Sequence, residues 1–187
     1  MRLSQLLLDM DYTVLQGEQD REISTLVYDS RKVEQDSVFV CISGAVRDGH
    51  DFAPEVAAKG AAVLIVEKEV TVPDEVTVIR VADSRLALAQ LSAAYFDHPA
   101  KELTTIGITG TKGKTTTTYM VKSILEEVGI KVGLIGTIEA IIGDKSIPAN
   151  NTTPESYTIQ KYFSEMVEEG CECVVMEVSS QLSLIHI

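Results

Sequence analysis

The stretch Thr109-Gly110-Thr111-Lys112-Gly113-Lys114-Thr115 decides the fold of the second half of this chain. It follows an apolar segment at Leu103–Thr109 that is rich in β-branched residues, which predicts a strand. It leads into Lys114–Val128, where a helix of about four turns is expected before Gly129. A glycine-rich loop between a strand and a helix is the setting in which a G-x-x-G-K-T sequence binds phosphate.

The residue types in this loop suit a nucleotide. Glycines let backbone N–H groups turn toward one anion, and the helix N-terminus adds partial positive charge. Lys114 can reach the β- and γ-phosphates of ATP, and the Thr115 hydroxyl can ligate Mg²⁺. The alternative is a glycine-rich turn with a solvated lysine, because Ile108 stands where the longer eight-residue pattern requires glycine. The predicted nucleotide-binding residues are Gly110, Thr111, Lys112, Gly113, Lys114, Thr115 and Thr116.

The segments after the loop continue an alternation of strand and helix. Lys131–Gly136 and Glu172–Val178 are predicted strands, and the stretch between Gly136 and Thr153 is interpreted as a loop. A helix is expected up to Glu169, with Thr153 as its N-cap and Pro154 as its first residue. This order predicts a three-stranded parallel sheet with right-handed crossovers.

Glu177 is a carboxylate inside an otherwise apolar predicted strand. A buried carboxylate is costly unless it is paired or binds a metal. Ligands of such sheets lie beyond the carboxyl ends of the strands, so Glu177 and the phosphate loop should meet there. We predict that Thr115 and Glu177 share Mg²⁺, with Lys114 and Glu177 as the catalytic residues. The alternative is an exposed carboxylate on an uncovered edge strand.

Residues 1–97 have a different pattern of predicted secondary structure, in which short strands and helices follow one another in mixed order. A helix that begins at Asp83 or Ser84 ends near Tyr95, and Phe96–Ala100 is expected to link it to a second domain at residues 103–187. Two polar clusters follow predicted strands, and we interpret them as turns, with nucleotide binding as the alternative. These polar clusters lie at Asp29–Arg31 and Gly44–Asp51. The strands expected in this part of the chain are Ser24–Tyr28, Ser37–Ile42, Ala62–Val66 and Val76–Val81, and a further helix is expected at Phe52–Lys59.

The composition narrows the class of protein. Of the 187 residues, 45% are hydrophobic and 24% charged, which is typical of a globular protein. The net charge of −12 argues against a nucleic-acid partner, because phosphate backbones require a basic face. No apolar stretch approaches the ~18 residues of a membrane span, and no signal peptide is evident, so we expect a cytoplasmic monomer without a membrane partner. The three cysteines are expected to be structural.

Five motifs in this order resemble the Mur ligase family, and the resemblance covers nearly the whole chain up to Gln181. It is closest to the members that add the third amino acid, diaminopimelate or lysine, to UDP-MurNAc-L-Ala-D-Glu in peptidoglycan synthesis. The motifs are Asp29-Ser30-Arg31, Asp48-Gly49-His50, the run from Gly110 to Thr117, Asn151-Thr152-Thr153-Pro154 and Met176-Glu177-Val178-Ser179-Ser180.

The resemblance implies a small N-terminal α/β domain that binds the UDP group, a central phosphate-loop ATPase domain with a parallel sheet, and a C-terminal ligase domain. It implies that ATP phosphorylates a substrate carboxylate, and that an amine attacks the acyl phosphate with release of phosphate. It places the Ala45-Val46-Arg47 stretch near the uridine diphosphate. The substrate-binding residues that it implies are Tyr28, Ser30, Asn151, Thr152, Thr153 and Ser179.

The chain also departs from the family pattern. Lys112 stands where many relatives have asparagine, and Leu182–Ile187 do not match the expected continuation. The carbamylated lysine that holds a second Mg²⁺ and the C-terminal domain are missing. We therefore expect a chain that is truncated inside its central domain and is catalytically inactive as it stands.

Two rival functions remain open at this point. Folylpolyglutamate synthetase has a similar short phosphate loop but lacks a separate UDP-binding domain, so residues 1–97 argue against it. A non-catalytic nucleotide-binding module would not require the carboxylate of Glu177 beside its loop.

Overall fold

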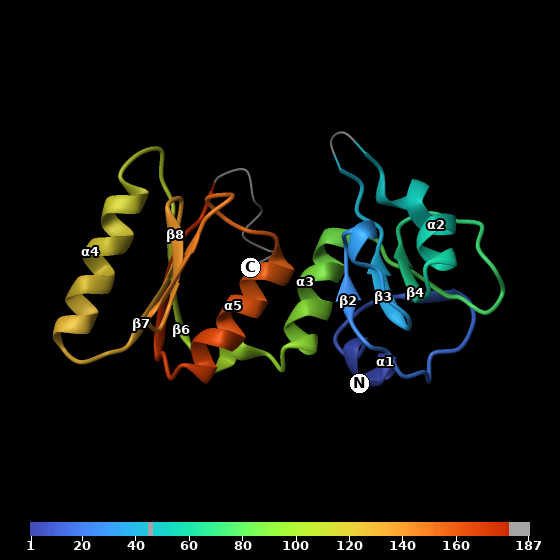
Figure 1. Cartoon of the computed structure of the whole chain (residues 1–187), viewed down its shortest axis with the longest axis horizontal. Coiled ribbons are helices and arrows are strands. Elements are labelled where there is room, and N and C mark those ends of the chain that lie inside the picture. Colours follow the sequence, from blue (N-terminus) through green and yellow to red (C-terminus); the bar gives the residue numbers. More distant parts are fainter. Residues whose placement is uncertain (45–46, 180–187) are drawn as a thin grey trace. The chain divides into compact units, whose positions relative to one another are not determined.

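The computed structural model describes residues 1–44 and 47–179, and these form two compact units, Met1–Tyr95 and a second that begins at Phe96. Both units are of the α/β class, and each contains a sheet with parallel strands (Figure 1). The predicted linker at Phe96–Ala100 follows the boundary directly. None of the helices in these residues has the length and apolar composition of a membrane span.

In the first unit, the described residues form a five-stranded sheet in the order β1-β5-β4-β3-β2. The four strands from β2 to β5 are parallel, and β1 is antiparallel to β5. The strands are β1 (Thr13–Gln16), β2 (Leu26–Val27), β3 (Ser37–Val40), β4 (Ala61–Val66) and β5 (Thr77–Arg80). The helices are α1 (Leu3–Leu6), α2 (Ala53–Ala58) and α3 (Ser84–Tyr95), with 3₁₀ turns η1 (Ser30–Lys32) and η2 (Gly49–Phe52).

The predictions for this unit were right for its central elements. β4 is buried at every position, as expected of a parallel strand that is covered on both faces. Asp83 caps α3, because its Oδ1 accepts the N–H groups of Arg85 at 2.8 Å and Leu86 at 3.0 Å. β1 and α1 were not predicted, because each has only four residues and lacks a long periodic pattern.

In the second unit, the described residues form a five-stranded sheet in the order β6-β10-β7-β8-β9. The first three are parallel, and β8 and β9 form an antiparallel hairpin beside β7. The strands are β6 (Thr104–Ile108), β7 (Val132–Ile135), β8 (Glu139–Ile142), β9 (Lys145–Pro148) and β10 (Cys173–Glu177). The helices are α4 (Lys114–Glu127) and α5 (Ser156–Glu168), with a 3₁₀ turn η3 (Pro99–Lys101).

Two predictions for this unit were wrong. The segment between β7 and α5 is a hairpin rather than a loop, so the sheet has five strands and not three. Its turn residues Gly143-Asp144, with φ 55° at Gly143, are a recognised hairpin signal that was overlooked. Thr153 is not the N-cap of the following helix, because the helix begins at Ser156 after Glu155.

The two long helices pack on opposite faces of this sheet (Figure 1). Alternate residues of β10 divide between them: Val174 and Met176 pack in the cluster that contains α5 residues, whereas Val175 packs beside α4 residues. On the α5 face, Met166 is fully buried and lies directly over Gly133 of β7.

We predict that Gly133→Ala destabilises the protein by about 1–3 kcal/mol, because a methyl group there overlaps the Met166 side chain. Met166→Ala alone should cost about 2–5 kcal/mol through the cavity that it leaves. The double variant should be no less stable than Met166→Ala, since the cavity accepts the new methyl group. Urea unfolding of the three variants measures their free energies of unfolding. If the double variant loses the sum of the two single losses, the two residues do not share space.

Candidate functional site

The loop between β6 and α4 has the backbone of a phosphate-binding turn. Gly110 has φ 149° and Gly113 has φ 81°, a region that residues with a Cβ rarely adopt. Gly113 is the N-cap of α4 and makes no side-chain cap, so the first N–H groups of the helix face the loop. Lys114 Nζ donates to the Gly110 carbonyl oxygen at 2.8 Å, which places the ammonium group across the loop.

Glu177 lies at the carboxyl end of β10, between β6 and β7, and its side chain is 1% exposed. Strand alternation gives it the same side of the sheet as Val175, which is the side covered by α4. The alternative of an exposed carboxylate on an edge strand is therefore wrong. A carboxylate buried to this degree must be satisfied by hydrogen bonds or by a cation.

The phosphate loop and Glu177 meet as the sequence predicted. Thr115, in the first turn of α4, donates its hydroxyl to Glu177 Oε2 at 3.1 Å. The contact follows from topology, because β6 leads directly into the loop and β10 is the neighbouring parallel strand in register with it. The carboxyl ends of both strands therefore open onto the same edge of the sheet.

Thr137 is a site residue that sequence reasoning missed. Its backbone N–H donates to Glu177 Oε1 at 2.9 Å, and its hydroxyl donates to Glu177 Oε2 at 3.1 Å. A signal was present, because Gly136-Thr137 directly follows β7 and the end of a parallel strand is where ligand sites form.

The other threonines of α4 do not face Glu177. The hydroxyls of Thr117 and Thr118 donate to carbonyl oxygens of the preceding turn, and Thr118 is fully buried, as expected for a packing role. Thr116 is exposed and lines a hollow on the surface of α4 together with Tyr119 and Met120. Its predicted contact with the nucleotide stays a prediction.

The segment predicted to bind the UDP-sugar lies beside the same strand end. Thr152 Oγ1 is 3.2 Å from Thr137 Oγ1. Thr153 is buried, and its hydroxyl donates to the Glu177 carbonyl oxygen at 2.9 Å and accepts the Ser179 N–H at 3.0 Å. Asn151 is exposed next to them. The structure thus brings Thr152, Thr153 and Ser179 together near Glu177.

Ser30 and Arg31 lie in the 3₁₀ turn η1 of the first unit, and Asp29 caps this turn by accepting the Arg31 N–H, as the turn interpretation expected. The Asp29 carboxylate accepts two side-chain hydrogen bonds from Arg31, which lower the pKa of Asp29 to about 2. Ser30 and Tyr28 are half-buried, and the Ser30 carbonyl oxygen accepts a hydrogen bond from Lys59 Nζ at 3.1 Å. Of the predicted uridine-diphosphate stretch, Ala45 and Val46 lie outside the described residues.

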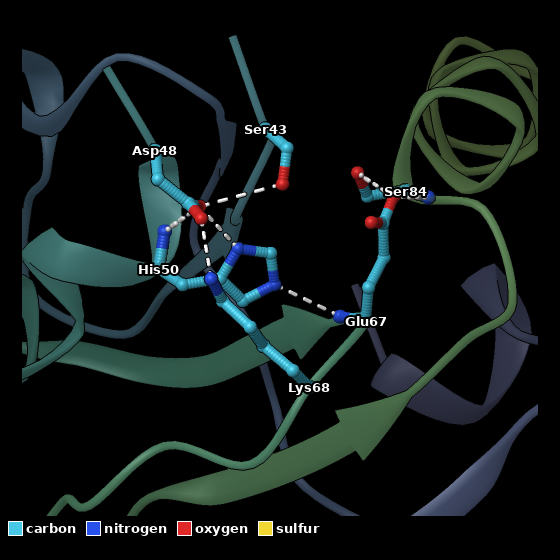
Figure 2. Close-up of polar contacts among 6 residues, drawn as sticks. All are labelled: Ser43, Asp48, His50, Glu67, Lys68 and Ser84. Carbon is cyan, nitrogen blue, oxygen red and sulfur yellow. Dashed lines mark hydrogen bonds and ion pairs between the residues drawn. The ribbon is translucent and has the colours of Figure 1, made fainter.

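Asp48 and His50 form a second polar cluster in this unit (Figure 2). His50 Nε2 accepts the Glu67 N–H at 2.9 Å, so the ring proton lies on Nδ1 and points to Asp48 Oδ1 at 2.6 Å. Lys68 contacts the other carboxylate oxygen, and its hydrogen bond, with that from the His50 N–H, holds the pKa of Asp48 well below its ordinary value. The cluster ties the segment after β3 to the end of β4.

The oxygens of Thr115 and Glu177 fit Mg²⁺ bound together with a nucleotide. Across residues 1–44 and 47–179 there is no group of three or more His, Cys, Asp or Glu side chains that could hold a metal alone. Mg²⁺ commonly uses one or two protein oxygens and takes its other ligands from phosphates and water. A hydroxyl and a carboxylate 3.1 Å apart beside a phosphate loop match that donor set.

Comparisons with known proteins agree with this geometry. Residues 22–96 match the catalytic domain of the Mur ligase family, and residues 108–184 match the Mur ligase middle domain. The match at 22–96 argues against the folylpolyglutamate synthetase alternative. A UDP-N-acetylmuramoyl-L-alanyl-D-glutamate–2,6-diaminopimelate ligase from Clostridium perfringens is 48% identical over 180 residues, which cover 96% of this chain and 37% of that protein.

Solved structures give the same result for the fold. A crystal structure of MurF from Acinetobacter baumannii has a TM-score of 0.66 and 27% identity, and the match covers 98% of this chain and 36% of that one. A structure of UDP-N-acetylmuramoyl-L-alanyl-D-glutamate–2,6-diaminopimelate ligase has a TM-score of 0.76 at 21% identity, covering 97% and 36%. The chain thus spans little more than a third of the length of its relatives. Both of its units match this family, and the chain belongs to the Mur ligases.

Proposed function

We propose that this chain supplies the nucleotide-binding and UDP-substrate-binding parts of an ATP-dependent, ADP-forming amide ligase. Its reaction adds the third amino acid to UDP-MurNAc-L-Ala-D-Glu in the synthesis of the peptidoglycan precursor, in the cytoplasm. The Clostridium perfringens relative is named as a 2,6-diaminopimelate ligase, so this is the amino acid to test first, with lysine second. The observation that carries the proposal is the 3.1 Å contact between Thr115 of the phosphate loop and the buried Glu177.

The residues of this site have separate tasks in the proposed reaction. The N–H groups of Gly110–Gly113 and the start of α4 bind the phosphates of ATP. Lys114 neutralises charge that develops on the transferred phosphoryl group, and Thr115 and Glu177 hold Mg²⁺. The metal, when bound, supplies further charge neutralisation on the phosphates. Catalysis of this kind depends on positioning and electrostatics rather than on a nucleophile from the protein.

Substrate-binding residues are proposed in each unit separately. Tyr28, Ser30 and the stretch around Arg47 are proposed to bind the uridine diphosphate. Asn151, Thr152, Thr153 and Ser179 are proposed to bind the rest of the UDP-sugar. Support for the second group is that Thr152, Thr153 and Ser179 lie within two hydrogen bonds of Glu177, beside the proposed metal.

Replacing Lys114 by alanine should lower the rate of ADP formation by about 10²–10³-fold, because a positioned charge is lost from the phosphoryl group. The measurement uses the full-length gene product with ATP, UDP-MurNAc-L-Ala-D-Glu and diaminopimelate. Lys122→Ala is the matched control, since Lys122 is on the same helix but pairs with Glu126. Equal losses in both variants would contradict the assignment of Lys114.

Replacing Glu177 by glutamine should abolish Mg²⁺-dependent turnover while the protein stays folded, because glutamine keeps the shape of the side chain and removes its charge. Glu139→Gln is the control: Glu139 is on the neighbouring hairpin and also accepts hydroxyl groups, from Tyr119 and Ser146. Turnover at increasing Mg²⁺ concentration distinguishes the two variants. A Glu177→Gln enzyme with intact turnover would favour the non-catalytic nucleotide-binding module.

A further inference from the structure

Thr137 contacts both oxygens of the Glu177 carboxylate, and this pair of contacts fixes the plane of the group. The N–H of Thr137 donates to Oε1 and its hydroxyl donates to Oε2, at 2.9 and 3.1 Å. The last torsion angle of a glutamate side chain has a broad energy well, so burial alone leaves the carboxylate plane loosely defined. Two donors from one residue remove that freedom. Thr137 thereby sets the direction in which the remaining lone pairs of Glu177 point.

The residue before Thr137 has to be glycine for this contact to form. The parallel register of β7 and β10 pairs Ile135 with Met176, so Gly136 lies beside Glu177 at the next step. A Cβ on Gly136 would stand 2.7 Å from Glu177 Oε1, closer than such atoms approach. Gly136 therefore leaves the space that the carboxylate occupies, and Thr137 donates the hydrogen bonds that hold it there.

The hydroxyl of Thr137 also connects Glu177 to Thr152. A threonine hydroxyl has one proton, and a carboxylate can only accept, so the Thr137 proton is given to Glu177 Oε2. The 3.2 Å contact between the two hydroxyl oxygens must then use the proton of Thr152. Hydrogen bonds thus run in one direction, from Thr152 to Thr137 to Glu177, and donors arranged in series strengthen one another.

We propose that Thr137 is a positioning residue that orients Glu177 for the metal–nucleotide and links this carboxylate to Thr152 of the UDP-sugar segment. The proposal rests on the proposed function, and it adds a residue that the sequence did not assign to the site. Loss of a residue that holds a metal ligand in place commonly weakens metal binding about 10- to 100-fold.

The first test uses Thr137→Val, which keeps the branched shape and removes only the hydroxyl. In the full-length gene product, the Mg²⁺ concentration that half-saturates binding of the ATP analogue AMP-PNP, measured by calorimetry, should rise about 10-fold or more. Thr137→Ser should restore the wild-type value. Thr118→Val is the control, because its buried hydroxyl bonds only to carbonyl oxygens of α4.

A second variant displaces the Glu177 carboxylate through its other oxygen, Oε1. Gly136→Ala presses on Oε1 and leaves the Thr137 hydroxyl in place, so the Mg²⁺ requirement should again rise. Circular dichroism at each Mg²⁺ concentration confirms that the compared variants are folded. Because Thr137 is exposed, its valine variant should fold like the wild type.

The relay is tested by a double-mutant cycle on the same binding measurement, without UDP substrate. Thr152→Val should raise the Mg²⁺ requirement less than Thr137→Val does. In the Thr137→Val background it should add nothing, since the hydrogen bond that it removes no longer acts on Glu177. Independent, additive effects would overturn the link to Thr152.

The outcomes separate this inference from the proposed function. If the wild-type protein binds AMP-PNP without any dependence on Mg²⁺, or Glu177→Gln changes nothing, the proposed function fails and the inference fails with it. If Glu177→Gln abolishes Mg²⁺-dependent binding but Thr137→Val matches Thr118→Val, the positioning role alone is overturned.

Discussion

The burial of the Glu177 carboxylate at the end of a central strand is the constraint on which the second unit depends. The group is 1% exposed, and its hydrogen bonds come from the start of α4 and from the segment after β7. An unsatisfied carboxylate at that depth would cost more than most single contacts in a domain can offset. The ends of β6, β7 and β10 must therefore stay in register for the sheet and the site to exist together.

Much of this arrangement could be predicted from sequence because it follows from strong local signals. The glycines before Lys114 specify a turn, the apolar run before Glu177 specifies a buried strand, and the parallel order of strands sets both at one edge. The contact between Thr115 and Glu177 is thus predictable from the sequence. In the first unit, β4 and α3 were predictable for similar reasons, since one is a continuous apolar run and the other has a capping aspartate.

The rest could not be predicted, because competing interactions decide it. Thr153 followed by proline has the local pattern of a helix N-cap, yet its hydroxyl bonds to the main chain of Glu177 and Ser179, and the helix starts three residues later. A tertiary contact here outweighs a local preference of about 1 kcal/mol. Thr137 has no pattern of its own, because its role arises from the register between β7 and β10, which sequence does not state.

The geometry also bears on which form of nucleotide the site can accept. The chain has a net charge of −12, and the Glu177 carboxylate stands beside the first turn of the phosphate-binding helix. A triphosphate placed there without a counterion would meet a negative group at short range in a partly desolvated setting, where repulsion is strongest. A divalent cation between the two reverses the sign of that interaction. On the proposed function, the carboxylate that is buried at the centre of this sheet would thus favour a metal-bound nucleotide over a free one, so that the structural and the chemical demands on Glu177 coincide.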